Sequence, residues 1–318
     1  MILLTDVSDY LGKTILSRLQ SSEQWEKIRV IVPPEKNFHI EKYDKTEYVT
    51  GRLNDHPFLD KALKDIDTLI LNTSNILYDY RALFKALISA AKGNEINHLI
   101  YISSVLAEDS SDTIAHECHE TELYIYQSGI PYTILRINIL MEQLPFFIGN
   151  PYENEKIYYP GGNGKINFIS SVDVSEVIFH ILNNKTSKNK IHILSHENGY
   201  TFYDIASKLS QIKRKNIFYE DIDLHIYEEA LSQTFLSVDS VNRLCNIARS
   251  IKQNKFNISD YTLQQILISQ VNNKKNIAQN IKEWFFCKEN KPLLLKHSIK
   301  NLPDFLSEAE WNKIYTLF

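Results

Sequence analysis

Short apolar runs alternate with helical patterns from Ile2 to Ile137, and this alternation constrains the fold more than any other feature of the sequence. The runs have the length and the β-branched composition of strands. We predict six strands, at Ile2–Leu4, Ile28–Val32, Glu47–Val49, Thr68–Leu71, His98–Ile102 and Tyr132–Ile137. Strands that are apolar on both faces and alternate with helices are typical of βαβ units, which build a parallel sheet covered by helices. The sequence therefore predicts an α/β protein with a Rossmann-type doubly wound parallel sheet.

The rhythm changes after Ile137, where prolines and glycines mark an irregular stretch that includes Pro145, Pro151 and Pro160–Gly164. A chain of 318 residues exceeds the usual size of a single core, so we expect two lobes. We predict a Rossmann domain over 1–150, a smaller, mostly helical lobe over 151–286 that is interleaved with it, and a C-terminal helical extension over 287–318. Elements predicted beyond the transition are strands at Asn167–Ile169 and Lys190–Leu194 and helices at Ser170–Leu182 and Thr201–Ile212.

Charge and cysteine usage narrow the class of protein. The formal net charge is -4, so no basic field attracts nucleic acid or an anionic membrane. No window is long enough to span a bilayer, and the first residues lack the basic lead of a secretory signal. Cys118, Cys245 and Cys287 lie far apart without a Cys-x-x-Cys pair. We therefore expect a cytoplasmic protein that binds neither nucleic acid nor membrane and has no structural metal site.

The first strand-to-helix turn is where a dinucleotide would bind, because backbone N–H groups and the helix dipole meet the pyrophosphate there. This turn spans Thr5–Gly12 and contains two carboxylates, Asp6 and Asp9. Asp9 lies at a natural N-cap, so its carboxylate can satisfy the amides that a phosphate would otherwise occupy. The alternative explanation is that both aspartates only cap the helix and form the turn. Either explanation predicts weak cofactor binding.

Several segments together resemble one known family. They are Thr5–Gly12, Gly51-Arg52-Leu53-Asn54-Asp55, Tyr101-Ile102-Ser103-Ser104, His119-Glu120-Thr121-Glu122, Ser128–Arg136 and Gly162-Asn163-Gly164-Lys165. Their pattern resembles the NmrA-like family of atypical short-chain dehydrogenases, and in particular its NAD(P)H:quinone reductases, up to about Lys282. The resemblance implies NAD(P) as the cofactor. Asp6 and Asp9, however, stand where the family has its first two glycines, so we expect this binding to be weak or lost.

Ligands of doubly wound folds bind beyond the carboxyl ends of the strands, at the point where the strand order reverses. With the turn residues that the family resemblance adds, the predicted cofactor-binding set is Thr5, Ser8, Tyr10, Leu11, Gly12, Asn72, Thr73, Ser103 and Ile137. Ser104 and Asn138 lie at the same strand ends. These small polar side chains suit an uncharged or cationic ligand as well as a nucleotide.

Two further departures from the family concern the cofactor and the chemistry. Members that prefer NADP commonly have a basic residue after the second strand, where this chain has Pro33 and Pro34; Arg29 and Lys36 are the nearby substitutes. The Tyr-x-x-x-Lys pair of classical dehydrogenases is absent from the predicted helix His116–Gln127 and occurs only at Tyr152 and Lys156, in the irregular stretch.

The predicted helix His116–Gln127 carries His119 and Glu122 in place of that pair. His119 is our candidate catalytic residue, because histidine can transfer a proton near neutrality; a purely structural role is the alternative. His116 and His119 lack the spacing and the third ligand of a zinc helix, so we predict a surface helix without metal.

The C-terminal extension places Trp311, Ile314, Tyr315 and Phe318 on one helical face after a capping box at Ser307 and Glu310. Packing onto the chain's own second lobe is favoured, and a homodimer or a protein partner is the alternative. Two functions follow from the sequence. The first is a ligand sensor, scaffold or regulatory protein with impaired NAD(P) binding. The second is an NAD(P)H-dependent oxidoreductase acting on quinones or similar small acceptors.

Overall fold

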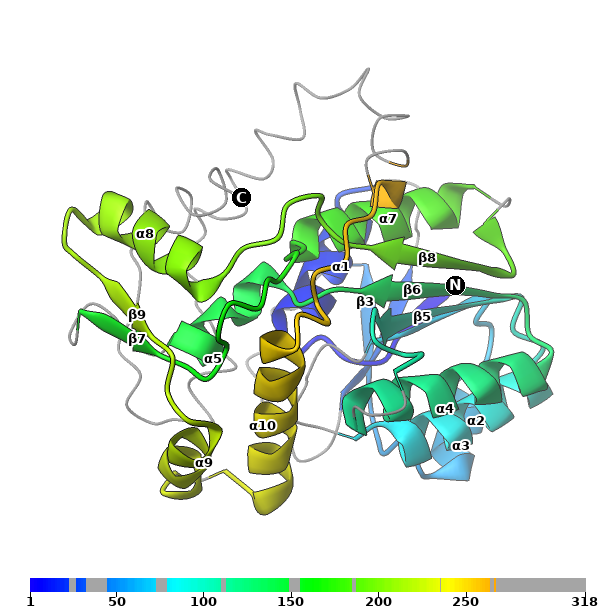
Figure 1. Ribbon diagram of the computed structural model, residues 1–318. Coiled ribbons are helices and arrows are strands. Elements are labelled where there is room, and N and C mark those ends of the chain that lie inside the picture. The colour runs from blue at the N-terminus through cyan, green and yellow to red at the C-terminus, as the bar shows by residue number, and fades with distance from the viewer. Residues whose placement is uncertain are drawn as a thin grey trace. The chain divides into compact units, whose positions relative to one another are not determined.

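The computed structural model describes residues 1–22, 27–32, 45–72, 79–109, 113–148, 155–184, 187–234, 236–263 and 266. The chain forms two compact units (Figure 1). The first comprises Met1–Ile137 and Ser171–Leu194, and the second comprises Asn138–Ser170 and the chain from Ser195 onward. The predicted domain limits, with a boundary near residue 150, stay a prediction.

A seven-stranded parallel sheet forms the centre of the first unit (Figure 1). Its strands are β1 (Ile2–Leu4), β2 (Ile28–Val32), β3 (Thr46–Thr50), β4 (Thr68–Leu71), β5 (His98–Ser104), β6 (Tyr132–Ile137) and β8 (Lys190–Leu194). Their order is β3-β2-β1-β4-β5-β6-β8, and every neighbouring pair is parallel. The order reverses between β1 and β4, so the predicted doubly wound sheet is confirmed and its switch point lies there.

Helices cover both faces of this sheet. They are α1 (Tyr10–Gln20), α2 (His56–Ala62), α3 (Arg81–Gly93), α4 (Thr113–Ser128) and α7 (Ser171–Asn183). Helices α1 and α7 pack together on one face, where the hydroxyls of Thr14 and Ser171 lie 3.2 Å apart and Arg18 pairs with Glu176. Helices α2, α3 and α4 lie on the other face (Figure 1). A core of fully buried side chains, among them Leu69, Phe84 and Leu99, joins these helices to the strands.

Local signals at the helix ends account for most of the observed boundaries. Gly129 follows α4 with a φ of 74°, the left-handed conformation predicted for a C-cap glycine. Helix α3 begins at Arg81. The carboxylate of Asp79 accepts the Arg81 N–H at 2.9 Å, so the chain before Arg81 is held in a turn.

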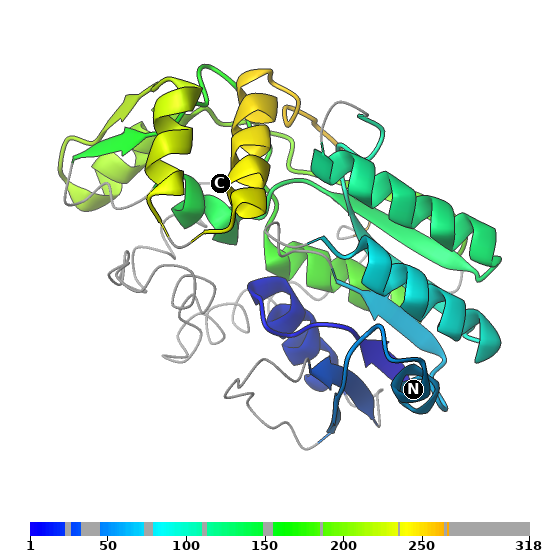
Figure 2. The same cartoon turned by 90° about the horizontal axis from the view of Figure 1, so that it is seen from below.

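The second unit is mainly helical. It contains a 3₁₀ turn (Met141–Gln143), α5 (Leu144–Ile148), α8 (Phe202–Lys213), α9 (Leu224–Ser232), α10 (Val238–Lys252) and a two-stranded parallel sheet of β7 (Lys156–Tyr158) and β9 (Phe218–Glu220). Helices α9 and α10 lie side by side in both ribbon views (Figures 1 and 2). Helix α8 opens with a capping box, in which Thr201 and Asp204 bond each other's backbone N–H.

The predicted strand at Asn167–Ile169 is wrong. This segment forms only isolated bridges, between Ile166 and Tyr200 and between Leu140 and Ile169. The side-chain amide of Asn167 donates to the carbonyls of His196 and Glu197 at 2.9 and 3.2 Å. The chain here is held by a polar side chain and single bridges, and not by a regular ladder. The predicted strand at Lys190–Leu194, by contrast, is the edge strand β8 of the first unit.

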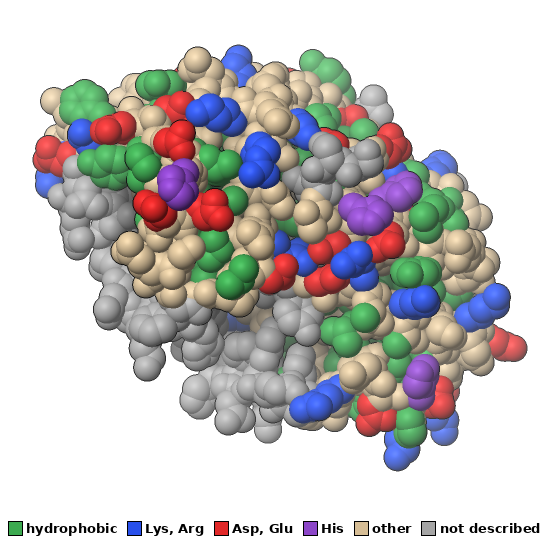
Figure 3. Space-filling view, turned by 60° about the horizontal axis from the view of Figure 1, so that its bottom comes forward, with side chains coloured by type: hydrophobic (Ala, Val, Ile, Leu, Met, Phe, Trp, Pro, Cys, Tyr) green, Lys and Arg blue, Asp and Glu red, His purple; other side chains and the backbone are tan. Residues whose placement is uncertain are grey.

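Within the parts of the chain that the structure describes, every helix is too short or too polar to cross a lipid bilayer. Acidic and basic side chains lie intermixed on the face shown in Figure 3, in keeping with the small net charge of -4.

Candidate functional site

The switch point brings together two of the predicted residues, one from the end of each central strand. Thr5 follows β1 and Asn72 follows β4, and both are almost fully buried. The Asn72 backbone N–H donates to Thr5 Oγ1 at 3.0 Å, and the Thr5 N–H donates to the carbonyl of Ile70 at 3.2 Å. These bonds extend the β1–β4 pairing by one residue and fix the place where the chain leaves the sheet for α1.

Asp9 caps helix α1, as predicted. Its carboxylate accepts the backbone N–H of Gly12 at 2.7 Å. The side-chain amide of Asn72 donates to both Asp9 carboxylate oxygens, at 3.1 and 3.2 Å, and reaches the backbone carbonyl of Asp6 at 3.3 Å. Asp9 is only 3% exposed. A carboxylate of this chain therefore lies at the amino end of α1, where the helix dipole attracts an anion.

Asp6 binds a second backbone N–H of the same turn. Its Oδ1 atom accepts from the Ser8 N–H at 2.7 Å, and Asp6 is also buried. The N–H groups of both Ser8 and Gly12 thus donate to carboxylates of this loop.

The close packing of α1 on the turn requires a glycine at position 12. A Cβ atom at this position would lie 2.1 Å from the Asp6 carbonyl oxygen and 2.8 Å from Val7 Cα. Such a contact between a helix and the preceding loop is the role that the last glycine of a dinucleotide motif performs. Next to Gly12, Leu11 is fully buried in the core and Tyr10 is half-buried.

A buried ion pair lies at the carboxyl ends of β5 and β6. Ser103 and Arg136 are register partners on these strands, and Ile137 ends β6. Arg136 donates from Nε and from a terminal nitrogen to the two oxygens of Glu122 on α4, at 3.0 and 2.7 Å. The Ser103 hydroxyl donates to Glu122 Oε1 at 2.7 Å. Glu122 is fully buried, so Ser103, a predicted cofactor contact, is hydrogen-bonded within the protein.

Arg136 also holds the chain segment that follows β5. It donates to Glu108 at 2.6 Å, and this hydrogen bond lowers the pKa of the Glu108 carboxyl. The Glu122 hydrogen bonds raise the pKa of the Arg136 guanidinium. Sequence reasoning placed Glu122 beside His119 but missed its partner. An arginine in the otherwise apolar strand Tyr132–Ile137 was the available signal, because a buried charge requires a partner.

His119 lies on α4 one turn before Glu122. Its Nδ1 atom is buried and has no hydrogen-bond partner among the described residues. His116 lies 3.9 Å from Glu120 in an exposed pair. No group of three or more metal-ligating side chains is assembled in the described part of the chain. The catalytic role of His119 stays a prediction.

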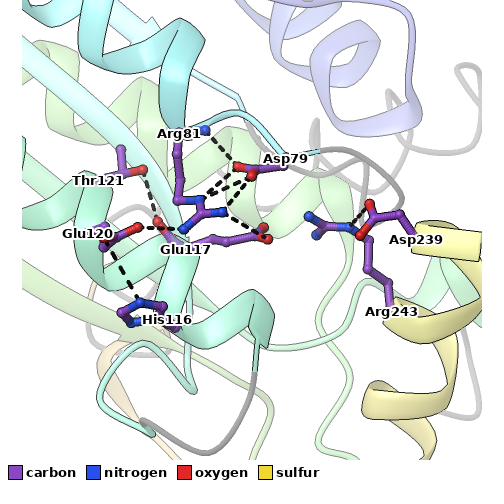
Figure 4. Close-up of polar contacts among 8 residues, drawn as sticks. All are labelled: Asp79, Arg81, His116, Glu117, Glu120, Thr121, Asp239 and Arg243. Carbon is purple, nitrogen blue, oxygen red and sulfur yellow. Dashed lines mark hydrogen bonds and ion pairs between the residues drawn. The ribbon is translucent and has the colours of Figure 1, made fainter.

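The start of α4 is also tied to α3 through Arg81, a cluster that the sequence did not predict (Figure 4). Arg81 donates to Asp79 at 2.8 Å and to Glu120 at 2.6 Å, and Glu117 lies 4.0 Å away. These hydrogen bonds raise the pKa of the Arg81 guanidinium. Figure 4 also shows a separate pair within the second unit, Arg243 with Asp239 at 2.8 Å.

Arg29, one of the substitutes considered for a 2′-phosphate contact, is engaged elsewhere. It lies near the start of β2, forms an ion pair with Glu47 at 2.9 Å, and donates to the carbonyls of Ala62 and Lys64 at 2.7 Å each. Arg29 is buried, so its role is to join β2 to β3 and to the end of α2. Lys156 lies in β7 and pairs with Glu220 at 2.8 Å. Thr73, Pro33, Pro34, Lys36, Tyr152 and the extension 287–318 lie outside the described residues.

Comparison with known proteins agrees with this architecture. The chain is 23% identical over 239 residues to quinone oxidoreductase 2 of Escherichia coli, which covers 74% of this chain and 82% of that protein. The crystal structure of the NADPH complex of that oxidoreductase matches with a TM-score of 0.72 at 20% identity, over 84% of this chain and 94% of the other.

A second structural match is NmrA, a negative transcriptional regulator, in complex with NADP. It has a TM-score of 0.64 at 14% identity and covers 80% of this chain and 82% of the other. The model of the NmrA-like family matches residues 2–284. Since this match spans both units and includes the turn at Thr5–Gly12, the chain belongs to the NmrA-like family.

Proposed function

We propose that this chain is an NmrA-like Rossmann protein with impaired or absent NAD(P) binding that acts as a ligand sensor, scaffold or regulatory protein. One observation carries the proposal: the Asp9 carboxylate accepts the Gly12 N–H at the amino end of α1, where a dinucleotide pyrophosphate would bind. The side chains of the turn therefore do not fit this group, and we derive no reaction step through it.

Electrostatics support this assignment. A carboxylate about 5 Å from a phosphate, at an effective dielectric constant near 20, repels it by roughly 3 kcal/mol. Such a repulsion weakens binding about a hundredfold for each carboxylate. Asp6 and Asp9 both occupy the turn, and each already binds one of its N–H groups. On the adenosine side, Arg29 is held by Glu47 and two carbonyls, so it offers no contact to a 2′-phosphate.

The ligand of this proposal is a small molecule at the carboxyl edge of the sheet, near Asn72 and Ser103. A regulatory role is compatible with the fold, because the NmrA regulator shares it. A homodimer or protein partner bound through the C-terminal aromatic segment, and a cytoplasmic location, are further parts of the proposal. They rest on the sequence alone.

A second candidate is an NAD(P)H-dependent oxidoreductase acting on quinones or similar small acceptors. The named activity of the Escherichia coli relative favours it. Thr5, Gly12 and Asn72 also hold the turn in a compact form against β4, and the candidate catalytic residue His119 lies on α4 with a buried Nδ1 atom.

A calorimetric titration of NADPH and NADH tests the first candidate. We expect no saturable binding at micromolar cofactor to the wild-type protein, and a gain of at least a hundredfold in the Asp6→Gly/Asp9→Gly double variant. Asp55→Gly is the matched control, because Asp55 also caps a helix, α2, through the Phe58 N–H but lies outside the turn. A micromolar dissociation constant of the wild type for either cofactor would overturn the proposal. Steady oxidation of NADPH with a panel of quinones would establish the second candidate instead.

A further inference from the structure

In the described part of the second unit, two buried hydroxyl groups of an aromatic core lack hydrogen-bond partners. Tyr159 is fully buried, and its ring lies 4.6 Å from Phe202 and 5.5 Å from Phe147, measured between ring centroids. Tyr227, on α9, meets the Tyr159 ring edge to face at 5.2 Å. Neither phenol oxygen has a hydrogen-bond partner among the described residues.

A third tyrosine of the same core, Tyr219, has a hydroxyl group with hydrogen-bond partners. The Tyr219 hydroxyl donates to the Tyr159 backbone carbonyl at 2.8 Å and accepts the Gly161 N–H at 3.1 Å. Buried hydroxyls are nearly always paired in this way, because an unpaired one loses its bonds to water without replacement. Two exceptions whose rings are in contact therefore require one explanation.

The two hydroxyls lie in the same apolar surroundings, because the rings of Tyr159 and Tyr227 are in contact and both residues are buried. Burial raises the pKa of both phenols, because the apolar surroundings disfavour a phenolate. The same surroundings disfavour a charged ligand. Two O–H donors in an apolar environment are suited to an uncharged oxygen acceptor.

We propose that Tyr159 and Tyr227 are the two donors of a site for an uncharged acceptor oxygen inside the aromatic core of the second unit. The oxygen belongs either to an enclosed water molecule or to the carbonyl group of a small aromatic ligand that the surrounding rings would contact. The site is formed by residues of the second unit, whereas the turn at Thr5–Gly12 belongs to the first, so it does not depend on the function proposed above.

A double-mutant cycle of Tyr159→Phe and Tyr227→Phe tests whether the donors share an acceptor. If a water molecule is enclosed, each single variant should lower the unfolding temperature by roughly 2 to 4 °C. The double variant should lower it by less than the sum, because both bonds end on one oxygen. Tyr203→Phe is the control, since that ring is 51% exposed, and it should leave the unfolding temperature unchanged.

Acetophenone and ethylbenzene distinguish a ligand from water. If the site takes a carbonyl ligand, acetophenone should bind the wild type more tightly than ethylbenzene and lose about tenfold in affinity in each phenylalanine variant, while ethylbenzene is unaffected. The proposal is overturned if both variants are at least as stable as the wild type and neither changes acetophenone binding. Strictly additive losses of stability, without selectivity for acetophenone, would also overturn it, because the two hydroxyls would then act independently.

Discussion

The side-chain amide of Asn72 bonds both carboxylate oxygens of Asp9, at 3.1 and 3.2 Å, and so joins the end of β4 to the start of α1. The two residues lie on opposite sides of the switch point and are both buried. Within this turn, a side-chain amide and a carboxylate of the chain itself are therefore hydrogen-bonded to each other at the amino end of α1.

Replacement of Asn72 by alanine should destabilise the first unit by about 1 to 3 kcal/mol, because the buried Asp9 carboxylate loses a donor that it cannot replace with water. Unfolding in urea measures the change. Asn94→Ala is a suitable comparison, since the Asn94 amide donates to the Ala90 carbonyl in a half-buried position at the end of α3. Equal losses of unfolding free energy in the two variants would mean that the Asn72 hydrogen bonds stabilise the protein no more than the half-buried bond of Asn94.

Breaking the ion pair of Arg136 and Glu122 should cost more than breaking an exposed one. Arg136→Gln leaves the fully buried Glu122 carboxylate without its cation, and such a change typically costs about 3 to 5 kcal/mol. Lys156→Gln removes the partner of Glu220 in a pair whose side chains are 44% and 50% exposed, and it should cost at most about 1 kcal/mol. Chemical denaturation of both variants compares the two, and a loss for Arg136→Gln as small as that for Lys156→Gln would refute the prediction.

Stability should fall in mild acid because of His98. This residue is buried at the start of β5, with Nε2 2.8 Å from the Thr133 hydroxyl, and burial lowers its pKa from 6.5 to about 4. Lys188 lowers this pKa further and Asp67 opposes the shift. Between pH 6.5 and pH 4, the unfolded chain therefore binds a proton at His98 that the folded chain does not bind. The stabilisation is complete above pH 6.5 and is lost as the pH falls towards 4, by at most about 3 kcal/mol.

Urea unfolding of the wild type and of His98→Gln, followed from pH 7.5 to pH 4, isolates this contribution. Glutamine can keep a bond to Thr133 but does not titrate, so the stability difference between the two proteins should change below pH 6.5 and stay constant between pH 6.5 and pH 7.5. Parallel curves for the two proteins would exclude His98 as the source.

The strands of the first unit could be predicted closely from the sequence, because β1, β2, β4 and β6 are largely apolar runs with distinct ends and the apolar residues of β8 alternate with Lys190 and His192. The Asp9 cap was also predictable, since it depends only on residues within one turn. Contacts between distant segments could not be predicted from the sequence. Nothing local indicates that Asn72 reaches Asp9, that Arg136 meets Glu122, or that Arg29 binds carbonyls at the end of α2.

The failed strand at Asn167–Ile169 has the same cause. Its apolar pattern is that of a strand, but its backbone partners are single residues of distant segments, and the Asn167 amide binds the carbonyls of His196 and Glu197. The sequence could not predict that Tyr159 and Tyr227 lack hydrogen-bond partners among the described residues. Nothing in a sequence with 18 tyrosines indicates which hydroxyl groups are hydrogen-bonded.

Two glycines of this chain should respond in opposite directions to alanine. At Gly12 a Cβ atom would meet the Asp6 carbonyl oxygen at 2.1 Å, and that oxygen belongs to the backbone of the turn, so α1 and the turn must move apart. We expect Gly12→Ala to destabilise by about 1 to 3 kcal/mol or more. At Gly93, the last residue of α3, no heavy atom lies within 4 Å of the added Cβ. Gly93→Ala should therefore stabilise by about 0.4 to 1 kcal/mol, because the unfolded chain loses conformational freedom. Thermal unfolding of both variants measures the two changes, and a neutral Gly12→Ala would show that α1 is not held against the turn at the distance described.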